Sequence, residues 1–322
     1  MKAAMVFLAS AALVCASPLA RAADYPSKPI TLMIGFAPGG PSDVMARILT
    51  KKMEEILKQP LVIENRAGAG GSIAGAAVAR AAPDGYTVLL ATGSLLAINV
   101  SLYKNIGYDP EKDFEPIGLI GTQTNVLYLN PSVPPTSLGE LIAYAKANPG
   151  KLSFGSGGNG TPAHLAGELL KLEAKIDITH VPFRGTGPAL QAVIGGHVPM
   201  AFNPPSPLLP HIQSGTIRAL AITTLKRTAV LPEVPTIAES GFPGFEATTW
   251  HALVAPARTP KDVIATLHRA TAATVNDPPV HKALTDLGID VVGGTPEELR
   301  AYVKSEIPKW ADVVRASGAK VD

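Results

Sequence analysis

Short apolar runs that alternate with helical patterns are the feature of this chain that most limits its fold. Six of these runs are each followed by a loop rich in glycine, proline or serine. The loops cover residues 36–43, 64–71, 91–94, 155–161, 182–187 and 202–206. Strands that alternate with helices are typical of parallel α/β sheets, in which ligands bind beyond the carboxyl ends of the strands.

The glycines of these loops indicate what such a site would hold. Glycine lets backbone N–H groups approach a ligand closely, and the start of the following helix favours negative charge. So many loops of this kind in one chain predict a small anion held by main-chain groups. The pattern indicates binding rather than catalysis.

The strands and helices form two similar α/β sets. Strands are predicted at 30–36, 61–64 and 87–91, within an apolar block at 117–129, and at 152–154, 178–182, 199–202 and 219–223. After Trp250 we expect one strand and three capped helices, which begin at Thr259-Pro260, Pro278-Pro279 and Thr295-Pro296. Ser137 and Thr161 are expected to cap two further helices, because their hydroxyls can accept the first helical N–H groups.

The second set is inserted between the first set and the C-terminal helices. We therefore expect a first lobe made of residues 23–124 and 247–322 and a second lobe made of residues 125–246. The chain would cross between them near 120–128 and 244–252. Such an arrangement leaves a cleft, and clefts between domains are common ligand sites that can close by a hinge motion.

The N-terminus predicts an export signal over residues 1–22. Lys2 is followed by an apolar run at 3–14 and by an A-x-A cleavage site at 20–22. The only cysteine, Cys15, lies within this signal and is preceded by Val14, which argues against a lipoprotein. The exported chain would have no disulfide and no thiolate, which suits a bacterial periplasm.

Charge excludes some partners. The chain has 28 Lys and Arg residues against 26 Asp and Glu residues, and two of the basic residues belong to the signal. The exported chain is thus formally neutral and has no basic stripe, so we expect no nucleic-acid partner and no polybasic membrane contact. Aromatic residues make up only 5% of the chain, which is a poor supply for stacking sugars or bases.

One motif suggests a nucleotide. Gly155-x-Gly157-x-x-Gly160 matches the dinucleotide fingerprint between a strand and a helix. In that fingerprint the acid that binds the ribose ends the next strand, whereas here Asp177 precedes this strand. The loop also lacks the lysine of a phosphate-binding P-loop, since Gly160 is followed by Thr161. We therefore expect no nucleotide cofactor.

Catalytic and metal sites are not expected either. The chain has neither a G-x-S-x-G elbow nor an H-E-x-x-H motif. Ser156 and His164 lie near a helix start, where hydrogen bonding to a ligand or to backbone is more plausible than a triad. His164 and Glu168 share a helix face, but one pair makes no metal site. The other histidines are expected on the surface.

The first loop is the most distinctive. Pro38 sets a turn, Gly39 and Gly40 leave the backbone open, and Ser42 or Asp43 is expected to cap the next helix. An ordinary capped strand-to-helix turn has the same composition, and both interpretations can hold. The basic residues of the neighbouring loops, at positions 66 and 184, could pair a carboxylate or remain solvated.

These motifs together resemble one family. The matching segments are Phe36-Ala-Pro-Gly-Gly-x-x-Asp43, Glu64-Asn-Arg-x-Gly-Ala-Gly-Gly71, Ala82-Pro-Asp-Gly-Tyr-Thr87, Ser156-Gly-x-x-Gly-Thr161 with His164-Leu-Ala166, Val181-Pro-Phe-x-Gly185 with Pro188-Ala189, Gly195-Gly196-x-Val198, Arg218-Ala-Leu-Ala221, Leu231-Pro-x-Val-Pro-Thr236 and Pro256. They resemble the Bug family, the solute-binding receptors of tripartite tricarboxylate transporters. The resemblance extends over essentially the whole exported chain.

The resemblance implies a type II periplasmic-binding-protein fold, with two doubly wound α/β lobes that close on a small carboxylate. In such receptors one carboxylate group is held by main-chain and hydroxyl groups of the strand-end loops and by bridging waters. Carried over to this chain, the implied ligand-binding residues are Phe36, Gly39, Gly40, Ser94, Ser156, Thr161, His164, Phe183, Gly185 and Asn203. No catalytic residue, metal or cofactor is implied.

The resemblance also implies partners. The receptor would be a periplasmic monomer that presents its ligand to integral-membrane permease subunits; the alternative is a carboxylate-sensing input protein of a two-component signalling system. Many relatives have Asp where this chain has Asn203. The ammonium group of an amino-acid ligand would need a carboxylate such as that Asp as its partner. A non-amino mono- or dicarboxylate is therefore favoured. Phe36 and Phe183 could also flank an aromatic acid.

Overall fold

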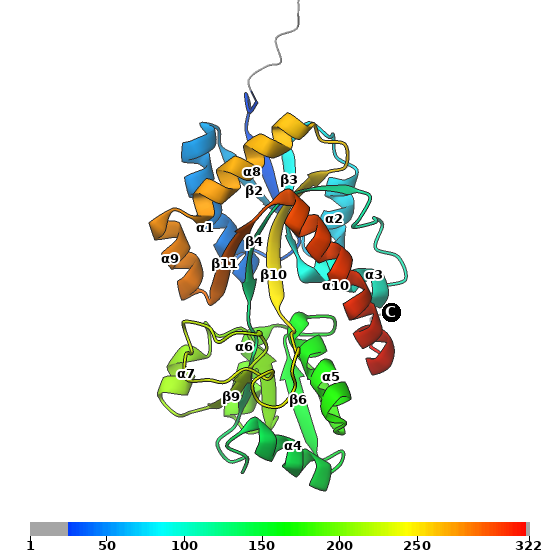
Figure 1. Ribbon diagram of the computed structural model, residues 1–322, viewed down its shortest axis with the longest axis vertical. Helices are drawn as coiled ribbons and strands as arrows, with labels where there is room; N and C mark the ends of the chain where they lie inside the picture. The colour runs from blue at the N-terminus through cyan, green and yellow to red at the C-terminus, as the bar shows by residue number, and fades with distance from the viewer. Residues whose placement is uncertain (1–24, 320–322) are drawn as a thin grey trace, which may run out of the picture.

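Two α/β lobes lie one above the other along the long axis of the molecule (Figure 1). The structure is a computed structural model, and it describes residues 25–319. The predicted export signal and Cys15 lie outside the described residues. Within the described range, one sheet has six strands in the order β11-β4-β10-β3-β1-β2, and the other has five in the order β7-β6-β8-β5-β9.

The six-stranded sheet is mixed. Its strands are β1 (Ile30–Ile34), β2 (Leu61–Asn65), β3 (Thr87–Thr92), β4 (Phe114–Gln123), β10 (Thr249–Pro256) and β11 (Ile289–Gly294). β1 pairs in parallel with β2 and β3, whereas β10 is antiparallel to β3 and β4. The helical segments around it are α1 (Pro41–Leu57), η1 (Ala69–Gly71), α2 (Ser72–Ala79), η2 (Ser94–Ile98), α3 (Asn99–Leu102), α8 (Lys261–Val275), α9 (Pro278–Asp286) and α10 (Pro296–Ser317).

The expectation of a single strand after Trp250 is wrong, because β11 is a second one. β11 is a short edge strand that pairs only with β4, and its pairing is interrupted between Val291 and Gly294. Two glycines and a half-exposed Asp290 weaken its strand pattern in the sequence. The apolar block at 117–129 holds the end of β4 and the whole of β5 (Val126–Leu129), which belong to different sheets.

The five-stranded sheet is mixed as well. Its strands are β5 (Val126–Leu129), β6 (Leu152–Ser156), β7 (Ile178–Pro182), β8 (Met200–Asn203) and β9 (Arg218–Ile222), and its helices are α4 (Leu138–Ala147), α5 (Pro162–Ala174), α6 (Thr186–Ile194) and α7 (Leu209–Gln213). β6 is parallel to β7 and β8, and β5 is antiparallel to β8 and β9. The expected caps of α4, α5 and α10 are confirmed at Ser137, Thr161 and Thr295. The expectation that α8 and α9 are also capped is wrong, because α8 follows Pro260, which has no acceptor side chain, and the side chain of Asp277 before α9 accepts no helical N–H.

The chain passes from the first sheet to the second at Thr124 and Asn125, and it returns between β9 and β10. Asn125 N donates to Thr223 Oγ1 at 2.9 Å, and Thr223 N donates to Thr124 Oγ1 at 3.1 Å. Asn125 Nδ2 also donates to the carbonyl of Ala247 at 3.4 Å. All these groups are buried, so the outgoing and returning segments are hydrogen-bonded to each other between the lobes.

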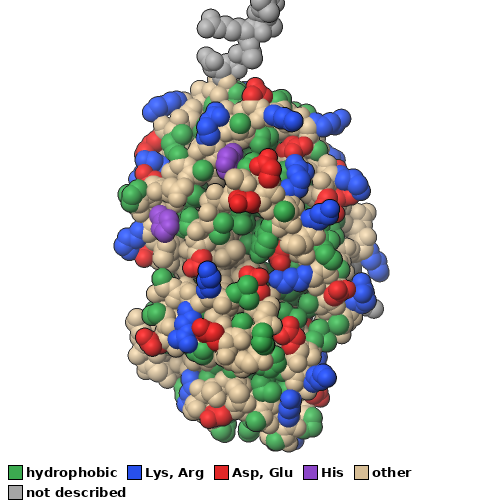
Figure 2. All heavy atoms as spheres, in the orientation of Figure 1, with side chains coloured by type: hydrophobic (Ala, Val, Ile, Leu, Met, Phe, Trp, Pro, Cys, Tyr) green, Lys and Arg blue, Asp and Glu red, His purple; other side chains and the backbone are tan. Residues whose placement is uncertain are grey.

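Surface charges of both signs are interspersed on the face shown in Figure 2. This distribution agrees with the nearly equal counts of basic and acidic residues in the sequence. None of the helices among residues 25–319 is both long and apolar enough to cross a membrane.

A buried carboxylate attaches the C-terminal helix to the six-stranded sheet. Glu306 on α10 is 3% exposed and accepts hydrogen bonds from Trp250 Nε1 at 3.1 Å and Trp310 Nε1 at 2.8 Å. Lys309 Nζ lies 2.9 Å from its other oxygen. Both indole N–H groups therefore have a hydrogen-bond acceptor inside the core, and the negative charge of Glu306 is paired with Lys309.

We expect Glu306→Leu to lower the free energy of unfolding by about 3 kcal/mol, because two buried indole N–H groups lose their acceptor. Glu306→Gln is the matched control, since its side-chain oxygen can still accept, and it should lose clearly less. Urea denaturation followed by tryptophan fluorescence measures both. Equal stability of the Leu variant and the wild type would contradict this role.

Candidate ligand-binding site between the lobes

A cavity of about 400 Å³ lies between the two lobes. Residues of the six-stranded lobe form one wall: Gly39, Pro41, Val44, Met45, Gln123, His251, Leu287 and Ile289. Residues of the five-stranded lobe form the other: Thr186, Pro204, Ser206 and Pro207. A cavity shared by two lobes places any ligand where it can contact both.

The two lobes approach each other closely at two glycines. Gly288 lies so close to Pro205 that an added Cβ would overlap the proline ring, and Gly160 is equally close to Leu102. Both glycines also have positive φ angles, +77° for Gly288 and +73° for Gly160, which side chains rarely adopt. Glycine at these two positions therefore permits the close approach of the lobes.

Two helix starts face the cavity, one from each lobe. Gly39 and Pro41 belong to the start of α1, and Thr186 is the first residue of α6. The residues before these helices, Gly40 and Gly185, provide no side-chain cap. The same holds for α2, α3, α7, α8 and α9, whereas α4, α5 and α10 each have a cap. The first backbone N–H groups of a helix have no partner within it, and the helix dipole adds partial positive charge there. The cavity thus suits an anion.

Asp43 orders the first loop without capping the helix. The expectation that Ser42 or Asp43 is the cap is wrong, because α1 begins earlier, at Pro41, and has no side-chain cap. Asp43 is instead 2% exposed and accepts from Arg47 Nε at 2.8 Å, from the N–H of Gly39 at 3.0 Å and from Asn65 Nδ2 at 3.2 Å. The Arg47 hydrogen bond, helped by that of Gly39, lowers the pKa of Asp43 to about 2.

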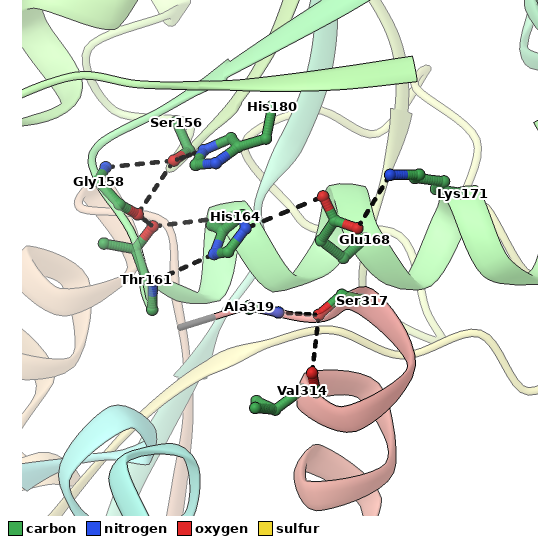
Figure 3. A network of polar contacts seen from close by, with 11 residues as sticks. Ser156, Gly158, Thr161, His164, Glu168, Lys171, His180, Val314, Ser317 and Ala319 are labelled. Carbon is green, nitrogen blue, oxygen red and sulfur yellow. Dashed lines mark hydrogen bonds and ion pairs between the residues drawn. The ribbon is translucent and has the colours of Figure 1, made fainter. Parts of the chain in front are cut away.

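Figure 3 shows a second polar network, at the start of α5. Ser156 Oγ is 2.7 Å from His180 Nε2 and accepts from the N–H of Gly158 at 3.2 Å. The N–H of Gly160 donates to His164 Nδ1 at 3.1 Å. The rings of His164 and His180 are stacked, with centroids 3.9 Å apart. Ser156 and His164 are therefore buried in internal contacts.

The histidines differ from the surface distribution expected. His251 is buried on β10, and His180 is partly buried against His164. Burial lowers the pKa of His164 and of His251 to about 4. Burial, together with the neighbouring His164, lowers the pKa of His180 to about 3. All three are therefore neutral at neutral pH.

The ten sequence-predicted residues fall into two groups. Gly39 lines the cavity, and five more lie within three residues of a lining position: Phe36, Gly40, Phe183, Gly185 and Asn203. The remaining four are Ser156, Thr161 and His164 around the start of α5, and the buried Ser94 at the start of η2.

Hydrogen bonds hold the loops of the second lobe together. The N–H of Phe183 donates to the carbonyl of Ser156 at 3.0 Å, and the N–H of Gly185 donates to that of Gly157 at 3.1 Å. Asn203 is fully buried, and its Nδ2 donates to the carbonyl of Thr186 at 3.0 Å. The loops nominated from the sequence thus form one cluster beside the cavity.

Several lining residues were missed by sequence reasoning. Gln123 and His251 lie within the ranges predicted for the lobe crossings, so the crossing strands were the available signal. Thr186 directly follows the nominated Gly185. Leu287 and Ile289 precede and begin β11, the strand that the sequence did not predict, and no motif marks them.

The buried histidines predict acid sensitivity. Their pKa values in the folded chain lie below the ordinary value of 6.5, so the unfolded chain binds more protons between about pH 6.5 and 4. Stability is therefore fully present above pH 6.5 and falls below it, by up to about 1.4 kcal/mol per pH unit for each histidine. Chemical denaturation at a series of pH values measures this loss.

His251→Phe tests one of these contributions separately. It should make the decline between pH 6.5 and 5 less steep, whereas His281→Phe, at an exposed position, should leave it unchanged. An identical slope in wild type and His251→Phe would mean that His251 is not held neutral by burial.

Two α/β lobes around a shared cavity define a two-lobed solute-binding protein. Comparison places the chain more closely: residues 45–319 match the family model described as "Tripartite tricarboxylate transporter family receptor", and the chain belongs to this family. Members of this family are substrate-binding proteins and not enzymes. The predicted Bug-family resemblance and periplasmic-binding-protein fold are confirmed.

Relatives extend over nearly the whole chain. Protein BugT of Bordetella pertussis is 40% identical over 98% of this chain and 96% of its own. The solved structure of the periplasmic binding protein BugD is 38% identical, with a TM-score of 0.79 over 92% of this chain and all of that one. MatC from Rhodopseudomonas palustris, solved with malate, is 36% identical, with a TM-score of 0.78 over 90% of this chain and all of its own.

A further R. palustris structure, solved with adipate, is 35% identical and has a TM-score of 0.82. It covers 92% of this chain and all of its own. Two relatives with this fold thus hold small organic carboxylates.

Proposed function

We propose that this chain is a periplasmic receptor that captures a small organic carboxylate between its lobes and presents it to the integral-membrane permease subunits of a tripartite transporter. The observation that carries the proposal is the pair of uncapped helix starts, of α1 and α6, at one interlobe cavity. The malate and adipate held by relatives support the same ligand class.

The chemistry of the cavity supports recognition by main chain. None of the described residues that line it is Lys or Arg. The guanidinium of Arg47, on α1, is hydrogen-bonded to Asp43. Backbone N–H groups and helix dipoles are therefore the positive ends available to a carboxylate. We place its head between the 36–40 loop and the 183–186 loop, with the remaining sequence-predicted residues supporting these loops.

Binding from both lobes explains how the ligand signals its presence. A carboxylate that contacts α1 and α6 together stabilises the closed arrangement, in which the lobes touch. The free energy of this stabilisation equals the difference between its binding free energies for the closed and the open forms. The permease would then recognise the closed surface. We propose that the receptor reaches the periplasm by cleavage of the signal at 1–22 and acts there as a monomer.

Thr186→Asp should abolish carboxylate binding and leave the fold intact. An acid in the first turn of a helix interacts favourably with the dipole, so α6 should keep its stability, but its charge would repel the ligand. Thr186→Asn has nearly the same shape without the charge and should still bind. Thermal shift and isothermal titration calorimetry against a panel of organic acids measure both variants. Unchanged affinity of Thr186→Asp would refute the proposed position of the carboxylate.

Delivery to a permease is tested separately. Proteoliposomes that contain the permease subunits should take up a labelled carboxylate ligand only when the wild-type receptor is added, and Thr186→Asp should not support uptake. Binding without uptake would instead favour the sensory role of a two-component input protein.

A further inference from the structure

The lining of the interlobe cavity also includes two polar side chains from the strands that lead into and out of the lobe crossing. Gln123 is the last residue of β4, and His251 lies near the start of β10. These strands are paired, with Gln123 opposite Thr249, so both side chains belong to one small region of the sheet. Both line the cavity, and they are 4% and 2% exposed.

The orientation of the Gln123 amide is fixed by its own hydrogen bond. Its Nε2 donates to the carbonyl of Leu287 at 2.8 Å. A carbonyl can only accept, so the nitrogen must be on that side of the amide. The side-chain oxygen of Gln123 remains as a hydrogen-bond acceptor. An acceptor at this place favours a ligand group that donates.

His251 has a hydrogen-bonding capacity that the fold does not use. Its Nδ1 is buried and has no hydrogen-bond partner among residues 25–319. The hydroxyl of Thr92, its cross-strand neighbour on β3, is also buried without a partner. Buried polar groups are normally satisfied, and an unsatisfied one costs stability. His251 lines the cavity and Thr92 does not, so a bound ligand could use the hydrogen-bonding capacity of the imidazole.

The protonation state of His251 determines which kind of ligand group it can bind. Burial lowers its pKa to about 4, and the imidazole is therefore neutral at neutral pH. A neutral imidazole has one N–H donor and one acceptor nitrogen. Together with the oxygen of Gln123, it matches a neutral group that both donates and accepts hydrogen bonds, such as a hydroxyl.

A second carboxylate fits poorly beside these two side chains. The lining of the cavity is largely apolar, with Met45, Ile289 and Pro207 among its residues, and no described lining residue is Lys or Arg. A carboxylate here would lose its water, meet the acceptor oxygen of Gln123 and find no cation. The apolar wall suits the carbon chain that joins the two ends of the ligand.

We propose that His251 and Gln123 read the far end of the bound acid, and that the preferred ligand is a monocarboxylate with a neutral hydroxyl on a short apolar chain. The proposal rests on the proposed function, because the carboxylate head is assigned to the starts of α1 and α6. It adds the residues that determine specificity and the class of tail that they select.

Calorimetric titration with acids of one carbon-chain length tests the tail. The probes are pentanoate, 5-hydroxypentanoate and glutarate, followed by the corresponding four- and six-carbon sets. We expect the hydroxy acid of the best-fitting length to bind about tenfold more tightly than the plain acid and the diacid, which corresponds to one additional satisfied hydrogen bond. Tightest binding of the diacid would overturn the proposal.

His251→Phe tests the residue. This variant keeps an aromatic ring but removes both ring nitrogens, so the hydroxy acid should bind about tenfold more weakly and the plain acid equally well. Because Nδ1 has no protein partner, the melting temperature of the ligand-free variant at pH 7.5 should be unchanged or higher. A lower melting temperature with the preference for the hydroxy acid retained would show a structural role instead. His281→Phe is the surface control.

The outcomes separate this inference from the proposed function. Equal binding of all three acids, abolished by Thr186→Asp, would leave the carboxylate site intact and overturn the role of His251 and Gln123. Failure of every carboxylate to bind the wild type would overturn the proposed function itself and this inference with it.

Discussion

The paired crossing between the two lobes is the constraint on which the rest of the structure depends. Hydrogen bonds between Thr124, Asn125 and Thr223 hold the outgoing and returning segments together in a buried position. Because both sheets are attached to this connection, the start of α1 and the start of α6 reach one cavity from opposite sides. The same crossing strands supply Gln123 and His251. The connection therefore brings together the two helix starts and also forms part of the cavity wall.

The electrostatics of the cavity follow from what its lining lacks as well as from what it contains. With no Lys or Arg among the described lining residues, positive potential comes from fixed backbone dipoles. Asp43 contributes by ordering the first loop, since its charge is neutralised by Arg47 and it fixes the N–H of Gly39. Backbone dipoles bind the carboxylate group of a ligand and do not distinguish the rest of the molecule. Selectivity among acids must therefore come from the rest of the cavity, which is where His251 and Gln123 lie.

The sequence was sufficient for the features that depend on local chemistry. Alternating strands and helices, the hydroxyl caps at Ser137, Thr161 and Thr295, and the glycine-rich loops are all encoded by neighbouring residues. The family resemblance gave the two-lobed fold. What could not be predicted depends on contacts between distant segments. The strand β11 exists because β4 provides an edge for it, and the burial of His251 results from packing across the sheet. For the same reason, Ser156 and His164 could be nominated from their motif, but their stacking and hydrogen-bonding network with His180 could not.

The central claim is that two uncapped helix starts, one from each lobe, hold the head of a carboxylate. A crystal structure of the complex with the acid that binds most tightly tests it directly. The account predicts carboxylate oxygens about 3 Å from first-turn backbone nitrogens of α1 and α6, directly or through one water. A carboxylate bound outside the interlobe cavity, or one held by the side chain of a lysine or arginine, would contradict it.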